Sequence, residues 1–230
     1  MKMKIIGIAT AWIFIFCLPL LLLTASAGGA VNSLWLYQYG FDKYNASQRT
    51  GLAQLEMKKA ATGLIRYFNS DEEYISLSVE KDDKSFELFN QREVAHLRDV
   101  KELIWLDYRV LLVTLVYALG YAGIRLFLRK DRRQLVRGLI GGSGLTLALM
   151  LALGLGAMLN FDQLFLQFHL ISFTNELWLL DTTKDYLIML FPGGFWFDAF
   201  LFCALATAVG AVVLGGVGGG YLVFSQNRAT

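Results

Sequence analysis

Side chains that could do acid–base chemistry gather around the two histidines of this chain, His96 and His169. His96 lies in a polar run in which Glu93 stands three residues before it and Asp99 stands three residues after it. On a helix, residues at this spacing share one face. A carboxylate beside an imidazole fixes the tautomer of the ring and raises its basicity. The spacing therefore indicates a general base that Glu93, Asp99 or Lys101 would orient, and a charged, solvated helix is the alternative interpretation.

His169 has a different setting, because its neighbours Phe165, Phe168, Leu170 and Phe173 are all apolar. Desolvation favours the neutral form of an imidazole, and a neutral ring can accept a proton. This setting indicates a second acid–base group. A histidine that bonds to the backbone of a helix at the membrane interface is the alternative.

Four further side chains after His169 belong to the candidate site: Asn175, Trp178, Asp181 and Asp185. Asn175 is a candidate hydrogen-bond donor to a reacting group. Asp181 also fits as the N-cap of a short helix from Thr182 to Leu190 that Pro192 ends. For Trp178, an aromatic anchor at the membrane interface is favoured over a contact with a ligand.

Other catalytic and metal-binding patterns are missing from the sequence. It contains no GxSxG, CxxC or HExxH motif, and Cys17 and Cys203 both lie in apolar runs. Such cysteines are expected to be buried thiols rather than a disulfide. We expect no metal or cofactor, and we expect the attacking nucleophile to come from the substrate. The net charge of only +2, with scattered basic residues, gives no sign of nucleic-acid binding.

The chain is apolar enough to be a membrane protein, since 56% of its residues are hydrophobic, against about 45–50% in soluble domains. Four runs are long enough to span a bilayer; they cover residues 5–27, 105–128, 139–160 and 198–224. The first run ends in Ala25-Ser26-Ala27, as a cleaved signal peptide can, but it is long for one, so a retained span is favoured. The spacing Gly216-x-x-x-Gly220 predicts close helix packing, with a flexible helix end as the alternative.

Residues 28–104 are predicted to form an extracytoplasmic α+β domain. An amphipathic pattern indicates a helix over 49–68, and alternating patterns over 74–79 and 85–89 indicate a β-hairpin. Asn90 and Glu93 then have the spacing of a capping box. This box is expected to start the helix that carries His96.

Two further segments connect the later spans. Residues 129–138 form a basic loop. Residues 161–197 are too polar to span a bilayer and too apolar for an ordinary loop, which predicts an interfacial or re-entrant segment. The N-terminal lysines, the basic loop and Arg228 fall on one side of a four-span protein, and the positive-inside rule makes that side cytoplasmic.

This orientation places both termini in the cytoplasm and both histidine-bearing segments on the extracytoplasmic side. The two histidines can then meet at one membrane surface. The expected fold is a mainly α membrane protein of four transmembrane helices, with an extracytoplasmic domain of helix plus β-hairpin and a second, interfacial segment.

Two sequence patterns resemble the lipoprotein intramolecular transacylase family, whose members are four-span bacterial membrane proteins with an outward-facing active site. The first pattern is Phe89-Asn-x-x-Glu93-x-x-His96-x-x-Asp99-Val-Lys101. The second begins at Phe168-His169 and continues through Asn175-x-x-Trp178 to Asp185-x-Leu-Ile-x-x-Phe-Pro192. The sequence differs from the family pattern at Thr182 or Thr183, where the family often has a proline after the tryptophan. This difference affects the geometry of the loop more than the chemistry.

The resemblance implies a substrate and a reaction. The substrate would be a bacterial lipoprotein whose N-terminal Cys carries a thioether-linked diacylglycerol and a free α-amine. The enzyme would move the sn-2 acyl chain onto that amine, giving an N-acyl lyso-form lipoprotein without a cofactor or a separate acyl donor. His96 and His169 would be catalytic, and we favour His96 as the base. The supporting residues would be Glu93, Asp99, Lys101, Asn175, Trp178, Asp181 and Asp185.

Three other functions fit parts of the sequence. A non-catalytic four-span scaffold or binding protein would need neither histidine. A small transporter would carry charges inside its spans, whereas Asp107, Arg109, Arg125 and Asp198 all stand near span ends. A metal-dependent membrane hydrolase would use both histidines and a carboxylate. For a transacylase, the expected partners are the diacylated lipoprotein and the lipid of a bacterial cell membrane.

Overall fold

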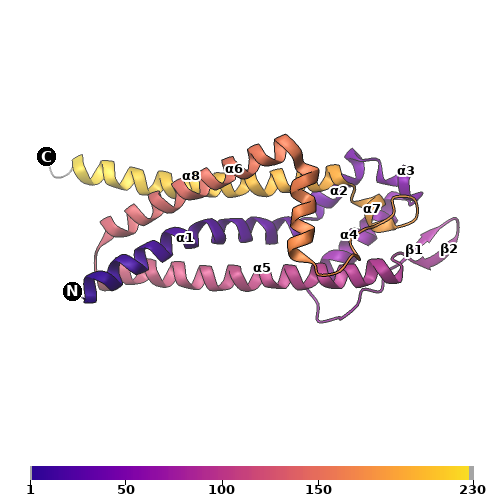
Figure 1. Cartoon of the computed structure of the whole chain (residues 1–230), viewed down its shortest axis with the longest axis horizontal. Coiled ribbons are helices and arrows are strands. Elements are labelled where there is room, and N and C mark those ends of the chain that lie inside the picture. Colours follow the sequence, from indigo (N-terminus) through magenta and orange to yellow (C-terminus); the bar gives the residue numbers. More distant parts are fainter. Residues whose placement is uncertain (1, 228–230) are drawn as a thin grey trace. The chain divides into compact units, whose positions relative to one another are not determined.

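The computed structural model describes residues 2–227 of the chain, with the side chains of residues 6–222, and Figure 1 labels its elements. This part is mainly helical. The long helices are α1 (Lys2–Val31), α5 (Gln91–Gly123), α6 (Arg132–Ser172) and α8 (Gly193–Asn227). All four are long and apolar enough to cross a membrane, which confirms the expected class of fold. Arg228, used to predict orientation, lies outside the described residues.

Shorter elements connect these helices. They are α2 (Leu34–Lys43), α3 (Ala46–Thr50), α4 (Gln54–Phe68), the strands β1 (Ser78–Lys81) and β2 (Lys84–Glu87), and α7 (Tyr186–Leu190). A π-helical turn, η1 (Ile124–Leu128), extends α5. Contacts divide the chain into two compact units. The first unit contains residues 1–28, 107–156 and 202–230, and the second contains residues 29–106 and 157–201.

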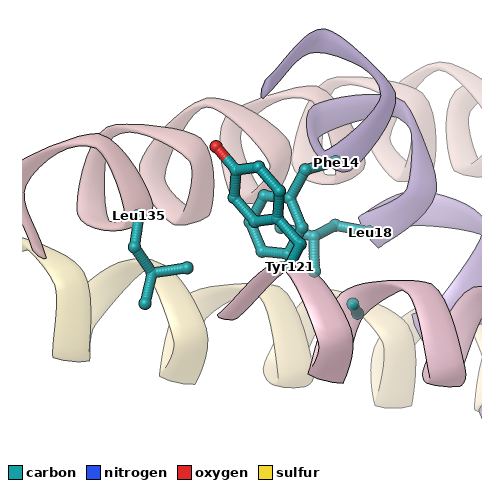
Figure 2. Close-up of a cluster of buried hydrophobic side chains, with 5 residues drawn as sticks. Phe14, Leu18, Tyr121 and Leu135 are labelled. Carbon is teal, nitrogen blue, oxygen red and sulfur yellow. The ribbon is translucent and has the colours of Figure 1, made fainter. Parts of the chain in front are cut away.

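The first unit is held together by packing between apolar helices. Figure 2 shows part of its core, where the ring of Phe14 on α1 stacks on Tyr121 of α5 with centroids 4.5 Å apart. Leu18, Ala118 and Leu135 complete this buried cluster. Both cysteines, Cys17 and Cys203, are free thiols, as expected.

Glycines allow close helix packing in the first unit, but at different positions from those predicted. A Cβ added at Gly142 on α6 would lie 3.1 Å from the backbone oxygen of Ile15 on α1, so the glycine permits this approach. Around Gly216 and Gly220, by contrast, no described atom lies within 4 Å of an added Cβ. The predicted contact of the Gly216-x-x-x-Gly220 face is therefore not observed within the described chain.

The second unit contains the α+β part of the fold. On α4, Leu64 and Phe68 are buried, as the amphipathic pattern predicts, together with Met57 and Tyr67. Leu55, which also belongs to the predicted apolar pattern, is 74% exposed. The helix begins at Gln54 rather than at residue 49. Gly51 explains the difference, because it ends α3 with a positive φ of 70° that breaks the helix.

The hairpin forms as predicted but with shorter strands. Its turn is the pair Asp82-Asp83, both with positive φ (52° and 60°), as a two-residue type I′ turn requires. Val79 pairs with Phe86 across the strands. Pairing ends at Leu77, whose carbonyl still accepts from the N–H of Leu88 at 2.8 Å, whereas its own N–H bonds to the Glu87 carboxylate at 3.0 Å. Residues 74–76 therefore lie outside the strand β1.

The segment 161–197 contains two helix ends and a loop. Asn160 leaves the helical region (φ −160°, ψ 85°) and kinks α6, as Figure 1 shows for its orange part. The side chain of Asn160 accepts from the N–H of Gln163 at 3.0 Å, so it caps the helical stretch that carries His169. The chain then forms a loop over 173–185, α7 and the start of α8.

Two helix boundaries near residue 190 differ from the prediction. The short helix begins at Tyr186 rather than Thr182, because Asp181 caps no helix and instead bonds to the N–H and hydroxyl of Thr183. The helix α8 begins at Gly193, before the predicted span start at residue 198. Pro192 sets this start, since its carbonyl accepts from the N–H of Phe195 at 2.9 Å.

Candidate active site

His96 lies in the second turn of α5, close to a capped N-terminus. The Asn90 side chain accepts from the N–H groups of Arg92 (2.9 Å) and Glu93 (3.1 Å). In return, the Glu93 carboxylate accepts from the N–H of Asn90 (2.8 Å). This reciprocal pair confirms the predicted capping box. It fixes where α5 begins, and it thereby fixes the direction in which His96 points from the helix.

Glu93 and Asp185 hold the start of α5 against the segment around α7. Glu93 is fully buried, and its second carboxylate oxygen accepts from the N–H of Leu187 at 2.6 Å. Asp185 is also buried, and it accepts from the Asn90 amide at 2.8 Å and from the N–H of Asp181 at 2.7 Å. Both carboxylates therefore satisfy backbone and amide donors rather than a histidine.

The structure brings the two histidines together. The ring centroids of His96 and His169 lie 6.4 Å apart, with the ring planes 27° from parallel. His96 is only 6% exposed, and Phe173 packs edge-on against it at 5.2 Å. Both rings belong to the second unit. A single reacting group can therefore lie within reach of both imidazoles.

The predicted pairing of His96 with a carboxylate is not observed. The buried Nδ1 of His96 has no hydrogen-bond partner among the described residues. Glu93 is occupied by the helix cap and by Leu187, and Asp99 accepts from the side-chain amide of Asn175 at 2.8 Å. Glu93 and Asp99 do lie one helical turn from His96, as the spacing predicts. Both carboxylates, however, already accept hydrogen bonds from other groups.

His169 is held in one tautomer by its own helix. Its Nδ1 lies 2.8 Å from the carbonyl oxygen of Phe165. A carbonyl can only accept a hydrogen bond, so Nδ1 must carry the proton and Nε2 must carry the lone pair. Aromatic rings enclose the imidazole: Phe165 at 4.4 Å, Trp178 at 4.8 Å, Phe168 at 5.4 Å and Phe173 at 5.7 Å. This arrangement presents a basic nitrogen in apolar surroundings.

The loop over 173–185 places Trp178 against His169. Arg92 of α5 donates to the carbonyls of Glu176 (2.6 Å) and Leu177 (3.4 Å). The indole N–H of Trp178 donates to the carbonyl of Asn175 at 2.9 Å. Together with the bond between Asn175 and Asp99, these contacts hold the loop over the histidine pair.

Two predicted site residues lie away from the imidazoles. The Lys101 ammonium donates to the carbonyl of Glu72 at 2.6 Å and lies 4.3 Å from the centre of the Tyr67 ring. Asp181 accepts from Thr183 and pairs with Lys184 at 3.2 Å. The hydrogen bonds from Thr183 lower the pKa of Asp181 to about 2. Both residues shape the surrounding loops.

Arg92 and Phe165 are the site residues that sequence reasoning missed. Arg92 precedes His96 by four residues and so shares its helix face, which is a usable sequence signal. Phe165 acts through its backbone carbonyl, for which the side chain gives no signal. Among the described side chains, no group of three or more His, Cys, Asp or Glu is placed to hold a metal ion.

Comparison with known proteins adds a family and a shared fold. The family model described as lipoprotein intramolecular transacylase Lit matches residues 12–196. The membrane-integral lipoprotein intramolecular transacylase Lit from Bacillus cereus superposes with a TM-score of 0.83 at 23% identity, over 99% of this chain and 100% of that one.

Two variants of the Bacillus cereus protein superpose as well. A histidine-to-arginine variant gives a TM-score of 0.79 over 100% of this chain and 97% of that one, at 22% identity. A histidine-to-alanine variant gives 0.78 over 100% of both chains, also at 22% identity. No curated protein matches the chain significantly.

Proposed function

This chain belongs to the lipoprotein intramolecular transacylase family, and from this premise we propose that it transfers an acyl chain from oxygen to nitrogen within one bacterial lipoprotein. The sn-2 acyl chain of the diacylglyceryl-Cys moves to the α-amine of the same residue. The observation that carries the proposal is the pair His96 and His169, 6.4 Å apart inside an aromatic enclosure. A non-catalytic scaffold is not favoured, because the family is one of acyltransferases.

The reaction needs proton transfer more than it needs a protein nucleophile. The amine and the ester belong to one molecule, so holding them together raises their effective concentration and lowers the barrier. The α-ammonium must first lose a proton, and the amine nitrogen then attacks the ester carbonyl carbon. The nitrogen loses a second proton to the base, and as the tetrahedral intermediate collapses the carbon–oxygen bond to the glycerol breaks and the leaving oxygen takes that proton. The products are an amide and a free hydroxyl.

We assign the base role to His169. Its Nδ1–H is engaged with the Phe165 carbonyl, which leaves Nε2 free to take the proton of the attacking amine. His96 is then suited to donate a hydrogen bond to the carbonyl oxygen as negative charge develops there, while the protonated His169 returns its proton to the leaving oxygen. This assignment reverses the role that the sequence alone favours for His96, since no carboxylate bonds to its buried Nδ1 among the described residues.

The aromatic walls support a lipid substrate. Phe165, Phe168, Phe173 and Trp178 contact His169, and Phe173 also contacts His96. These rings offer apolar surface to an acyl ester. Excluding water strengthens the hydrogen bonds that stabilise the transition state. We further propose that this site faces the extracytoplasmic side. The basic residues of the segment 129–138, which contains the start of α6, belong on the cytoplasmic side by the positive-inside rule.

The proposal is tested by acyl transfer on a diacylglyceryl lipoprotein with the purified protein. The transfer conserves mass, so tandem mass spectrometry must locate the acyl chain on the amine or on the glycerol. His96→Ala and His169→Ala should each reduce N-acyl product by about 10²–10⁴-fold. The matched control is Gln167→Ala, which changes an exposed side chain of the same helix and should keep wild-type activity. Wild-type product from both histidine variants would exclude this mechanism.

A further inference from the structure

A polar pocket of about 580 Å³ lies in the second unit and takes no part in the chemistry above. It is lined by Asn90, Arg92, Leu179, Leu180, Asp181, Lys184 and Asp185. Its volume falls in the range of about 300–1,000 Å³ that is typical of ligand sites. The pocket is large enough for a few amino-acid residues of a peptide.

Both walls of this pocket are neighbours of the histidine pair. On α5, Arg92 precedes His96 by one helical turn on the same face, a step of about 5–6 Å along the helix. On the loop, Leu179 directly follows Trp178, whose ring lies 4.8 Å from the ring of His169. If the acylated Cys of a substrate lies at the imidazoles, the one or two residues next to that Cys can therefore reach the pocket.

Along α5, the pocket residue Arg92 lies on the side of His96 that points away from the apolar part of the helix. Apolar residues predominate from Leu103 onwards, whereas residues 91–102, on both sides of His96, carry six charged side chains. A lipoprotein must leave its acyl chains in apolar surroundings while its hydrophilic polypeptide turns towards water. We propose that this pocket binds the polypeptide segment that directly follows the acylated Cys of the lipoprotein. The proposal rests on the acyl-transfer function above.

The charges of the pocket specify which peptides it favours. No described carboxylate pairs with the Arg92 guanidinium, which bonds only to two carbonyls and is exposed. Lys184 and Asp181 balance each other at 3.2 Å, with side chains 72% and 43% exposed. Asp185 is buried, with both oxygens already bonded. The reachable charge is therefore positive, and acidic or neutral residues after the Cys bind better than basic ones.

The test uses diacylglyceryl lipopeptides that differ only in the two residues after the Cys: Asp-Asp, Ser-Ser or Lys-Lys. With the full-length protein, the Lys-Lys peptide should show a KM about tenfold higher than the Asp-Asp peptide, with kcat little changed. Lys184→Glu should reverse this order, because it replaces a positive charge of the pocket by a negative one and leaves Asp181 without its partner. Lys59→Glu, the same change at an exposed lysine of α4, should leave the order as in the wild type.

Equal KM values for the three peptides, or an order that Lys184→Glu does not change, would overturn the pocket assignment. A complete lack of N-acyl product from every peptide would instead overturn the acyl-transfer function. In that case equilibrium binding of the same three peptides still decides the pocket assignment. Weaker binding of the Lys-Lys peptide, reversed by Lys184→Glu, supports the pocket, and equal binding rejects it.

Discussion

Ionisable residues around the histidine pair divide into those that can react and those that hold the backbone. Glu93 and Asp185 satisfy N–H and amide donors that would otherwise be buried without partners. An unsatisfied buried donor costs about 1–3 kcal/mol, so these carboxylates act on the stability of the site. His169, in contrast, keeps Nε2 for chemistry because its Nδ1 is bonded to the Phe165 carbonyl.

At this scale we predict that Glu93→Ala lowers the free energy of unfolding by about 2–4 kcal/mol, because it removes the helix cap and leaves the N–H of Leu187 unpaired. Glu93→Gln keeps one acceptor oxygen and should cost about half as much. Thermal unfolding in detergent measures both. Glu102→Ala, at a side chain that is 71% exposed, is the matched control. Equal melting temperatures for Glu93→Ala and Glu102→Ala would contradict the structural role.

Two elements decide how the histidines meet: the kinked end of α6 and the loop over 173–185. The kink at Asn160 starts a separately capped helical stretch that carries His169. The loop lies over the pair through a few polar contacts to α5, chiefly from Arg92 and Asp99. A loop held by few contacts opens more easily than a packed helix.

For the loop we predict that Asn175→Ala speeds amide hydrogen exchange over residues 174–180 at least about fivefold. The change removes the hydrogen bond to Asp99 (2.8 Å) and the one from the N–H of Leu177 (3.0 Å), each worth about 1 kcal/mol. The effect should be confined to the loop. Thr62→Ala serves as control, because the Thr62 hydroxyl bonds only to carbonyls of its own helix, at 3.0 Å. Unchanged exchange in the loop would show that the contact with Asp99 does not hold it.

For the kink we predict that Asn160→Ala lowers both stability, by about 1 kcal/mol, and the rate of acyl transfer. Alanine cannot accept from the N–H of Gln163, so the helical stretch that carries His169 loses its cap. Asn160→Ser retains an acceptor and should stay close to the wild type. The two variants are compared by thermal unfolding and by the mass-spectrometric assay, and equal behaviour of both would argue against the cap.

At the scale of the whole molecule, this is a multi-pass membrane protein in which each long helix contributes to two compact units. Without a hydrophobic driving force between helices in lipid, close packing at small residues stabilises such a protein. Gly142 supplies such a contact in the first unit, where an added Cβ would meet Leu18 and the Ile15 carbonyl. The second unit contains the histidine pair.

We therefore predict that Gly142→Ala destabilises the protein by about 1–3 kcal/mol through overpacking. Gly216→Ala is the paired control, because an added Cβ there meets no described atom within 4 Å, and it should be neutral or slightly stabilising. Melting temperatures in detergent distinguish them. A larger fall in melting temperature for Gly216→Ala than for Gly142→Ala would contradict the assignment of the close helix contact to Gly142.

Local patterns in the sequence were enough to predict several features. Apolar runs predicted the four membrane helices, because any span needs about 20 apolar residues. The Asn90 and Glu93 spacing predicted the capping box, which is a contact within one turn. The alternating pattern predicted the hairpin. The two histidines stood out because they are rare and lie in distinctive surroundings.

Only the tertiary structure decided which acceptor each donor uses. The sequence placed Glu93 and Asp99 on the same helix face as His96, but Glu93 bonds to Leu187 and Asp99 bonds to Asn175. Those partners lie more than 70 positions away along the chain, where spacing rules have no reach. The tautomer of His169 depends on a backbone carbonyl, which every residue possesses and no sequence pattern marks. Proton chemistry depends on these contacts. Local sequence was therefore enough to predict the two histidines as candidate catalytic residues, whereas the roles that we propose for them depend on the folded chain.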